Sequence, residues 1–195
     1  MNKQLEQMNS EELGTLFPII IAEPDPEWIK IFETEKANII TVLGAQHIIR
    51  VEHFGSTAVP NLKSKPTIDI LLEVSESIDT NLIKKKLKNM NYHYISRPEN
   101  PAPHMMFVKG YTLDGFKGQV YHIHVRYHGD WDELYFRDYL KLHPMIAREY
   151  GELKARLAEE YRNNREAYTE KKTAFIIRIT GQARNETLTN ETKFK

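Results

Sequence analysis

The feature that most constrains the fold is a change in hydrophobic period along the chain. Apolar residues recur at helical spacing over residues 26–43. In the segment QVYHIHVRYH, residues 119–128, apolar and polar side chains alternate strictly instead, which is typical of a half-buried β-strand. Helical spacing returns after Pro144 and continues to about residue 183. A chain that passes from helix to strands and back to helices predicts an α+β fold with a mixed sheet.

The individual elements follow from this period and from the turn residues between the runs. Strands are predicted at residues 48–55, 67–74, 92–96, 104–110 and 119–128, and helices at residues 3–16, 26–43 and 79–90, from residue 130 and from residue 144. The chain has no internal repeat and no Gly/Ser linker, so a second independent domain is not expected. We predict a single domain over 22–183, preceded by an N-terminal helical extension over 1–21 and followed by a polar tail over 184–195.

Composition excludes several classes of protein. The 195 residues include no cysteine, which excludes disulfides, iron–sulfur clusters, zinc–thiolate sites and a cysteine nucleophile. The 27 basic residues are balanced by 27 acidic ones, which argues against nucleic acid as the main partner. No run reaches the roughly 18 apolar residues of a membrane span, and the first sixteen residues lack the apolar core of a signal peptide. The sequence therefore predicts a cytoplasmic protein with no membrane partner.

The segment EHFGSTAVPNLKSKPTIDILLEV, residues 52–74, holds the residues best suited to bind a phosphate. The first strand ends at Gly55, which permits a tight turn whose backbone N–H groups can point at an anion. Two hydroxyl side chains follow the glycine as further donors, and two nearby lysines could neutralise phosphate charge. The candidate phosphate-binding residues are Gly55, Ser56, Thr57, Lys63 and Lys65. An ordinary turn after a strand has the same composition, so both interpretations stay open.

One carboxylate, Asp69, stands in an otherwise apolar strand at 67–74. Burying an unpaired carboxylate is costly, so Asp69 needs backbone amides or a nearby cation, or serves as a metal ligand or base. His122 and His124 share one face of a later strand at a spacing that suits metal ligation. If the two strands are neighbours, the three side chains could surround a metal or a phosphate. Imidazole ligands suit Zn, Ni or Fe better than Mg, and hydrogen-bonded strand histidines are the alternative.

Four further residues form a second tier of candidates: Glu52, His53, Glu73 and Arg137. One of Glu52 and His53 should point toward the turn, but strand alternation does not say which. Glu73 shares the strand face of Asp69 but lies about 13 Å along the strand, too far to hold the same ion directly. Arg137 either pairs with the carboxylate next to it in sequence or reaches a cleft.

Several motifs occur in a fixed order between about residues 22 and 183: Trp28 with the helix Phe32–Glu35, EHFGSTAVPNLKSKPTIDI, YHIHV, FRDYLKLHP, EYGELKARLA and AYTEKKTAF. In this set and order the chain resembles the GrpB-like proteins, and its Gly-Ser turn before an Asp-bearing strand resembles the core of the nucleotidyltransferase superfamily. The resemblance implies an α+β fold with a nucleotidyltransferase-like mixed β-sheet covered by helices and a long helical C-terminal region.

The same resemblance bears on chemistry. Active nucleotidyltransferases carry two carboxylates one residue apart on this strand and a third on a neighbouring strand, and these hold divalent cations against a nucleoside triphosphate. In this sequence the partner position of Asp69 is Leu71, so the pair is incomplete, which argues against two-metal transfer. The resemblance implies Mg or Mn as the cofactor, and less readily Zn. Asp69, His122 and His124 are then both the candidate metal ligands and the candidate catalytic residues.

Two functions follow as hypotheses. In the first, the protein binds a nucleotide or another phosphorylated small molecule, with or without nucleotidyl or phosphoryl transfer. In the second, it is a non-catalytic module derived from the same fold that binds a ligand or a partner. The sequence leaves the substrate and the oligomeric state open.

Overall fold

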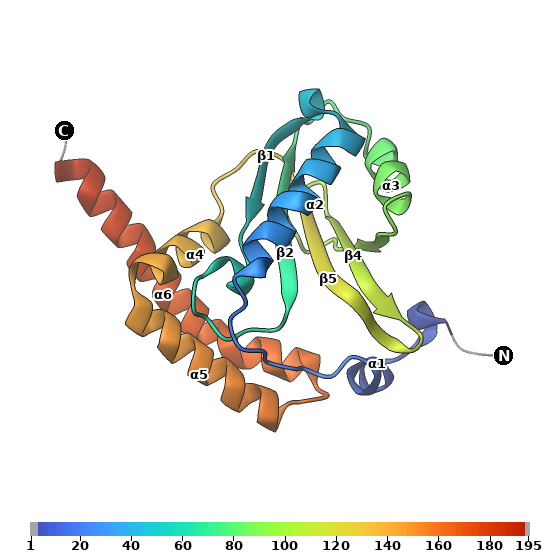
Figure 1. The fold of residues 1–195 in the computed structure, drawn as a ribbon. Helices are drawn as coiled ribbons and strands as arrows, with labels where there is room; N and C mark the ends of the chain where they lie inside the picture. The colour runs from blue at the N-terminus through green and yellow to red at the C-terminus, as the bar shows by residue number, and fades with distance from the viewer. Residues whose placement is uncertain (1–3, 194–195) are drawn as a thin grey trace. The chain divides into compact units, whose positions relative to one another are not determined.

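The computed structural model describes residues 4–193, in which the chain forms two compact units (Figure 1). The sheet unit consists of Asp25–Ala58 and Pro66–Asp130. The helical unit consists of the segment up to Pro24, the loop Val59–Lys65 and the chain from Trp131 onward. The loop that follows the Gly-Ser turn is therefore divided between the two units.

The sheet unit is built on five strands in the order β1-β2-β5-β4-β3. Their bounds are β1 Ile48–His53, β2 Thr67–Val74, β3 His93–Ser96, β4 Met105–Thr112 and β5 Gly115–Arg126. Strands β2 and β5 pair in parallel, whereas the β1–β2, β4–β5 and β3–β4 pairs are antiparallel. The sheet is therefore mixed, and the predicted α+β class is confirmed.

Two helices, α2 (Glu27–Leu43) and α3 (Thr80–Lys88), cover one face of this sheet (Figure 1). The residues of β2 that point toward them are apolar and inaccessible to solvent: Ile68, Ile70, Leu72 and Val74. From α2, the ring of Phe32 stacks on that of His53 with their centroids 4.7 Å apart. The alternation in β2 thus decides which side of the strand faces the helices and leaves Asp69 on the other side.

An ion pair between a buried carboxylate and a partly exposed lysine holds α2 on the sheet. The Glu35 side chain accepts hydrogen bonds from the Lys109 ammonium at 2.9 Å and from the Tyr92 hydroxyl at 2.7 Å. The same ammonium lies over the rings of Tyr92 and Tyr121, 5.0 and 4.9 Å from their centroids. Because a buried carboxylate is tolerated only when it is paired and hydrogen-bonded, this cluster fixes where α2 lies on the sheet.

The cluster shifts two ionisation equilibria. Burial alone raises the pKa of the Glu35 carboxyl, but hydrogen bonds from Lys109 and Tyr92 and the Lys109 charge outweigh it and leave the pKa below its ordinary value of 4.5. Burial, with a contribution from the Glu35 charge, raises the pKa of Tyr121 from 10.0 to about 12. A lowered carboxyl pKa gives stability that is present above pH 4.5 and lost as the pH falls through the folded-state pKa. A raised phenol pKa gives stability that is present below pH 10 and lost as the pH rises toward 12.

We expect Glu35→Gln to be less stable than the wild type at neutral pH, with a difference that shrinks as the pH falls below 4.5. The difference in stability shrinks because acid protonates the Glu35 carboxylate of the wild type, whereas the glutamine of the variant does not titrate. Urea unfolding of both proteins over that pH range measures the difference. Glu33→Gln, on the exposed side of the same helix, is the matched control. A difference for Glu35→Gln that stays constant with pH would contradict the stabilising role of the charged form.

The helical unit contains α1 (Ser10–Leu16), α4 (Asp132–Leu142), α5 (Pro144–Glu160) and α6 (Arg165–Lys193). Helix α5 begins at Pro144 as predicted, because proline at a first helical position lacks only an N–H that would have no partner in the helix. One apolar cluster joins the loop before Lys63 to three helices: Val59, Leu62, Leu140, Ala147, Tyr150, Phe175 and Ile179. A second cluster joins the N-terminal segment to α5 and α6: Ile19, Leu157, Ala158 and Tyr168.

The structure adds detail at the two ends of the chain. The N-terminal extension is held to the α5–α6 connection, since the Ile19 N–H donates to the Arg162 carbonyl at 2.7 Å. Gly14 lies so close to the Asn163 carbonyl that a Cβ would be 1.8 Å from its oxygen. At the other end, α6 continues through the predicted polar tail to Lys193. Among the described residues no helix is both long and apolar enough to cross a membrane.

Candidate functional site

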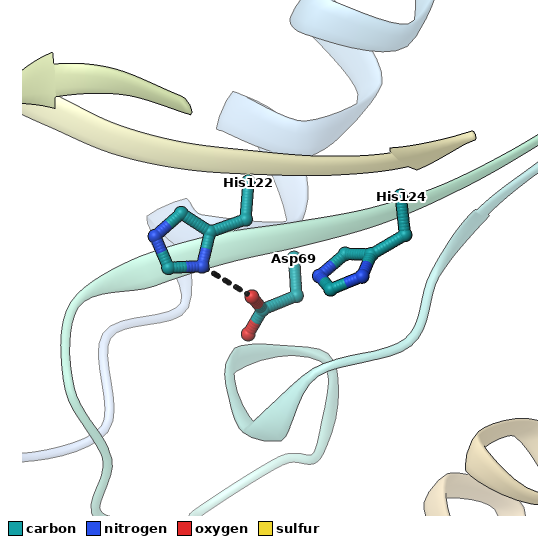
Figure 2. Close-up of side chains that lie close together, drawn as sticks. All are labelled: Asp69, His122 and His124. Carbon is teal, nitrogen blue, oxygen red and sulfur yellow. Dashed lines mark ion pairs between the residues drawn. The ribbon is translucent and has the colours of Figure 1, made fainter. Parts of the chain in front are cut away.

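Asp69, His122 and His124 lie together on the sheet face opposite α2. The parallel register of β2 and β5 pairs Asp69 with His122 and Leu71 with His124. Paired residues in neighbouring strands project to the same side, so both imidazoles share a face with the carboxylate. Figure 2 shows the two rings leaving β5 toward the Asp69 side chain of β2. The structure thus meets the condition set by the sequence, that the two strands be neighbours.

The three side chains present their donor atoms to one another. His122 Nδ1 lies 3.2 Å from Asp69 Oδ1 (Figure 2). One potential ligand atom from each of Asp69, His122 and His124 lies within 4.8 Å of the other two. The exposed fractions of the Asp69 and His122 side chains are 27% and 14%. The cluster is therefore partly desolvated, which strengthens its electrostatic interactions, but a small ligand can still approach it.

Aromatic side chains orient both histidines. The Tyr111 hydroxyl lies 2.7 Å from His122 Nε2, and the two rings are stacked at an interplanar angle of 14°. The Phe54 ring meets His124 edge-on, with centroids 5.1 Å apart. Both ring nitrogens of His122 are thereby engaged, Nδ1 by the carboxylate and Nε2 by the phenol. Contacts on both sides of an imidazole restrict its rotation and select its tautomer.

Gly55 lies directly against the Asp69 carboxylate. A Cβ at this position would be 2.2 Å from Asp69 Oδ2 and 2.6 Å from Asp69 Cβ, far inside van der Waals contact. The sequence predicts that glycine is needed here for the conformational freedom of a tight turn, but Gly55 is not among the glycines with positive φ. What requires glycine here is the close approach of the backbone to the carboxylate. The turn and Asp69 therefore form one packed unit.

The hydroxyls of the turn differ in their roles. Thr57 Oγ1 donates to the Thr67 carbonyl at 2.8 Å, so it must accept the hydrogen bond from His53 Nε2, which is also 2.8 Å long. These two bonds fix the turn to β1 and β2 and make Thr57 a positioning residue. Ser56 is half-buried and is the turn hydroxyl that stays a candidate for contact with a ligand.

The pairing register of β1 with β2 shows that Glu52 and His53 point to opposite faces of the sheet. His53 pairs with Ile70 on the helix-covered face, where it is buried against Phe32 and bonded to Thr57. Glu52 pairs with Leu71 and so projects to the face of Asp69. His53 therefore supports the turn from the helix-covered face. Glu52 is the acidic residue of β1 that lies on the same face as the candidate site.

Glu73 shares that face as well, but an ion pair accounts for its position. Its side chain is wholly inaccessible to solvent, and Arg50 donates to both carboxylate oxygens at 2.7 and 3.0 Å. The Gly129 N–H and the His128 ring lie 3.3 Å from the same carboxylate. Leu71, between Asp69 and Glu73 on this face, is only 2% exposed. The apolar partner position predicted from the sequence is thus filled by packed hydrocarbon.

The remaining predicted residues belong to the helical unit. Within that unit the Lys63 ammonium lies 2.6 Å from Glu23, and that of Lys65 lies 5.5 Å from the centroid of the Tyr168 ring. Arg137 forms two hydrogen bonds to its neighbour Asp138, at 2.7 and 2.9 Å. The first of the two alternatives for Arg137, an ion pair with the adjacent carboxylate, is present in the structure.

Sequence reasoning missed Tyr111. The predicted strand stops at Gly110, whereas β4 continues to Thr112 through an irregularity in its pairing with β5. Gly110 has φ 95°, and the pairing register shifts between Lys109 and Tyr111. In a regular strand these two side chains would share a face, but Lys109 reaches Glu35 on the helix side and Tyr111 reaches His122 on the other. A glycine inside a strand pattern is the signal that could have indicated this bulge.

Comparison with known proteins places the chain in a family. The sequence matches the family described as "GrpB protein" over residues 18–182. It is 33% identical over 168 residues to the glutamate-rich protein GrpB of Alkalihalophilus pseudofirmus, covering 84% of this chain and 95% of that protein. It is 40% identical over 167 residues to a UPF0157 protein of Pseudomonas aeruginosa, covering 85% and 67% of the two chains.

A solved structure is also similar. The crystal structure of the conserved protein GrpB from Enterococcus faecalis superposes with a TM-score of 0.75 at 31% identity, covering 87% of this chain and 99% of that one. Sequence and structure agree over most of the chain, and the protein therefore belongs to the GrpB family.

Proposed function

We propose that the sheet unit binds a phosphorylated small molecule, with a nucleotide as the leading candidate, through a divalent cation at Asp69. The observation that carries this proposal is the convergence of Asp69, His122 and His124, whose potential ligand atoms lie within 4.8 Å of one another. A cation held there keeps coordination positions for oxygens from outside the protein. Phosphate oxygens are natural ligands for such a cation, as in many nucleotide-binding sites.

The turn beside the carboxylate supports the same proposal. Gly55 brings the backbone against Asp69, so the turn that continues into Ser56 begins next to the proposed cation. Backbone N–H groups and hydroxyls are the donors that proteins commonly present to phosphate. In this arrangement the cation neutralises the phosphate charge and the turn orients the phosphate group.

A second candidate function is ligand binding without nucleotidyl transfer, and Leu71 is the residue that favours it. A two-metal mechanism needs carboxylate oxygens that bridge two cations, and the position beside Asp69 is occupied by a leucine that is 2% exposed. A second cation would need a carboxylate ligand at this position, and the packed leucine supplies none. The role that fits these residues best is a one-cation binding site in a nucleotidyltransferase-like fold.

We expect ATP with Mn²⁺ or Zn²⁺ to raise the thermal midpoint of the untagged protein. A ligand at 100 times its Kd stabilises the folded state by about 2.7 kcal/mol, which corresponds to a shift of several degrees. Asp69→Asn should remove the shift because it removes the charged ligand oxygen, and Ser56→Ala should reduce it. Asp114→Asn and Ser96→Ala, on the β4–β5 turn and on β3, are the matched controls.

The same samples test for chemistry. Pyrophosphate release from ATP, with water as the acceptor of the nucleotidyl group and measured with each metal, separates nucleotidyl transfer from binding. A thermal shift without pyrophosphate release supports the binding role, and release that depends on Asp69 establishes transfer. No shift with any pairing of ATP, GTP, CTP or UTP with Mg²⁺, Mn²⁺ or Zn²⁺ would exclude a nucleoside triphosphate as the ligand. A shift that survives both Asp69→Asn and Ser56→Ala would place the ligand elsewhere.

A further inference from the structure

The donor set at the candidate site does not fit the magnesium centre that a nucleotidyltransferase resemblance implies. Mg²⁺ prefers an octahedral shell of oxygen ligands from carboxylates, phosphates and water. Here the side chains that converge are one carboxylate and two imidazoles, with a buried leucine at the second carboxylate position. Imidazole nitrogen is a ligand for Zn, Fe, Ni, Cu and Mn sites, and magnesium sites rarely use it.

We propose that Asp69, His122 and His124 form a 2-His-1-carboxylate centre for a first-row transition-metal ion rather than for Mg²⁺. The inference rests on the cation site of the proposed function and specifies its metal. Two imidazoles and one carboxylate on one face of a sheet occupy one side of an ion and leave the opposite positions open. In this protein the open positions are where phosphate oxygens would bind.

The geometry suits a single ion. Bonds of about 2.1 Å place neighbouring donor atoms about 3.0 to 3.4 Å apart in octahedral or tetrahedral coordination. The separation of Asp69 Oδ1 and His122 Nδ1 is 3.2 Å, within this range before any ion is bound. His124 extends from the same strand face two residues on, and one potential ligand atom from each of the three side chains lies within 4.8 Å of the other two. Small side-chain rotations bring all three donor atoms onto one ion.

Tyr111 acts as the positioning residue for His122. When Nδ1 binds the metal, Nε2 carries the proton and donates to the Tyr111 hydroxyl oxygen, 2.7 Å away. The stacked phenol ring holds the imidazole plane at the same time. The bulge at Gly110 is what turns Tyr111 to this face. A polar partner for the second nitrogen of a ligand histidine is a regular feature of transition-metal sites. A magnesium site with only oxygen ligands does not require one.

The test is metal binding by chelator-treated, untagged full-length protein without nucleotide. We expect one Zn²⁺ or Co²⁺ per chain by titration calorimetry and elemental analysis, and much weaker binding of Mg²⁺. Asp69→Asn and His122→Ala should abolish stoichiometric binding. His93→Ala, which removes an exposed strand histidine from β3, should leave it unchanged and controls for adventitious surface sites.

The role of Tyr111 has its own measurement. Tyr111→Phe keeps the ring and removes the hydroxyl, and should weaken Zn²⁺ binding by about 10- to 100-fold and alter the visible absorption of bound Co²⁺. Tyr94→Phe is the matched control, because Tyr94 lies on β3, where its ring packs against Phe107. Equal unfolding free energies of the metal-free variants would show that the loss is not a folding defect.

Two results would overturn the inference. One is Mg²⁺ binding as tight as that of Zn²⁺ or Co²⁺, and the other is transition-metal binding that survives His122→Ala. Failure of the inference and of the proposed function can be told apart. If Zn²⁺ binds at Asp69 but no nucleotide raises the thermal midpoint, the metal centre is supported and the nucleotide-binding function is contradicted. If a nucleotide raises the thermal midpoint with Mg²⁺ alone and the shift requires Asp69, the proposed function is supported and the transition-metal inference is contradicted.

Discussion

Gly55→Ala should abolish ligand and metal binding at Asp69 and destabilise the fold by about 1–3 kcal/mol. The added methyl carbon would be 2.2 Å from Asp69 Oδ2, 2.6 Å from its Cβ and 2.8 Å from its Cγ. Neither partner can yield easily, because the Phe54 N–H bonds the Asp69 carbonyl at 3.1 Å and ties the turn to β2. The carboxylate must therefore rotate away from His122. Zn²⁺ titration and urea unfolding measure the two effects.

Gly181→Ala is the control for this substitution. Gly181 lies within α6, and a Cβ there would meet no atom within 4 Å. Replacing glycine by alanine inside a helix should stabilise the protein by about 0.5–1 kcal/mol. The two glycines thus predict effects of opposite sign for the same chemical change. Normal metal binding in Gly55→Ala would show that the turn does not fix the carboxylate.

Arg50→Met should cost about 3 kcal/mol of unfolding free energy, the lower end of the range for removing one partner of a buried ion pair, because Glu73 is buried but the Arg50 side chain is 33% exposed. Glu73 has no solvent-accessible side-chain surface, and both of its oxygens accept hydrogen bonds from Arg50. Methionine fills the volume of the arginine stem but supplies no charge. The carboxylate then has to be ionised in a site that has lost its principal cation. Urea unfolding followed by circular dichroism measures the loss.

Two comparisons make this result specific to the buried pair. Adding Glu73→Gln to Arg50→Met should recover part of the stability, since it removes the charge that was left behind. Arg148→Met breaks an exposed pair with Glu152 one helical turn away and should cost about 0.3–0.5 kcal/mol. A loss below about 1 kcal/mol for Arg50→Met would mean that other groups hold the Glu73 charge as well.

Much of the fold could be predicted from local pattern. The helical stripe from residue 26 and the strict alternation around residue 121 predict α2 and β5 because side-chain period is a property of each segment alone. Pro144 predicts the start of α5 for the same local reason. The continuation of α6 after residue 183 could not be predicted in this way, because a helix can continue through polar residues once its earlier part is packed.

The candidate site was only partly predictable. Asp69, His122 and His124 stand out in the sequence because a carboxylate in an apolar strand and two histidines on one strand face are unusual in themselves. Whether they meet depended on β2 and β5 pairing in parallel, more than fifty residues apart in sequence, in a register that sets Asp69 opposite His122. A shift of one residue would have turned both histidines to the helix-covered face.

The sequence by itself determined the period of each element, the lack of thiol ligands and the leucine that leaves Asp69 as the single carboxylate of an incomplete pair. Only the tertiary structure decided what surrounds that carboxylate: the backbone of Gly55 against it, His122 opposite it and Tyr111 turned toward His122 by a bulge. The physical reason is that period arises from neighbours along the chain. Register and close approach instead arise from packing between segments that the sequence keeps apart.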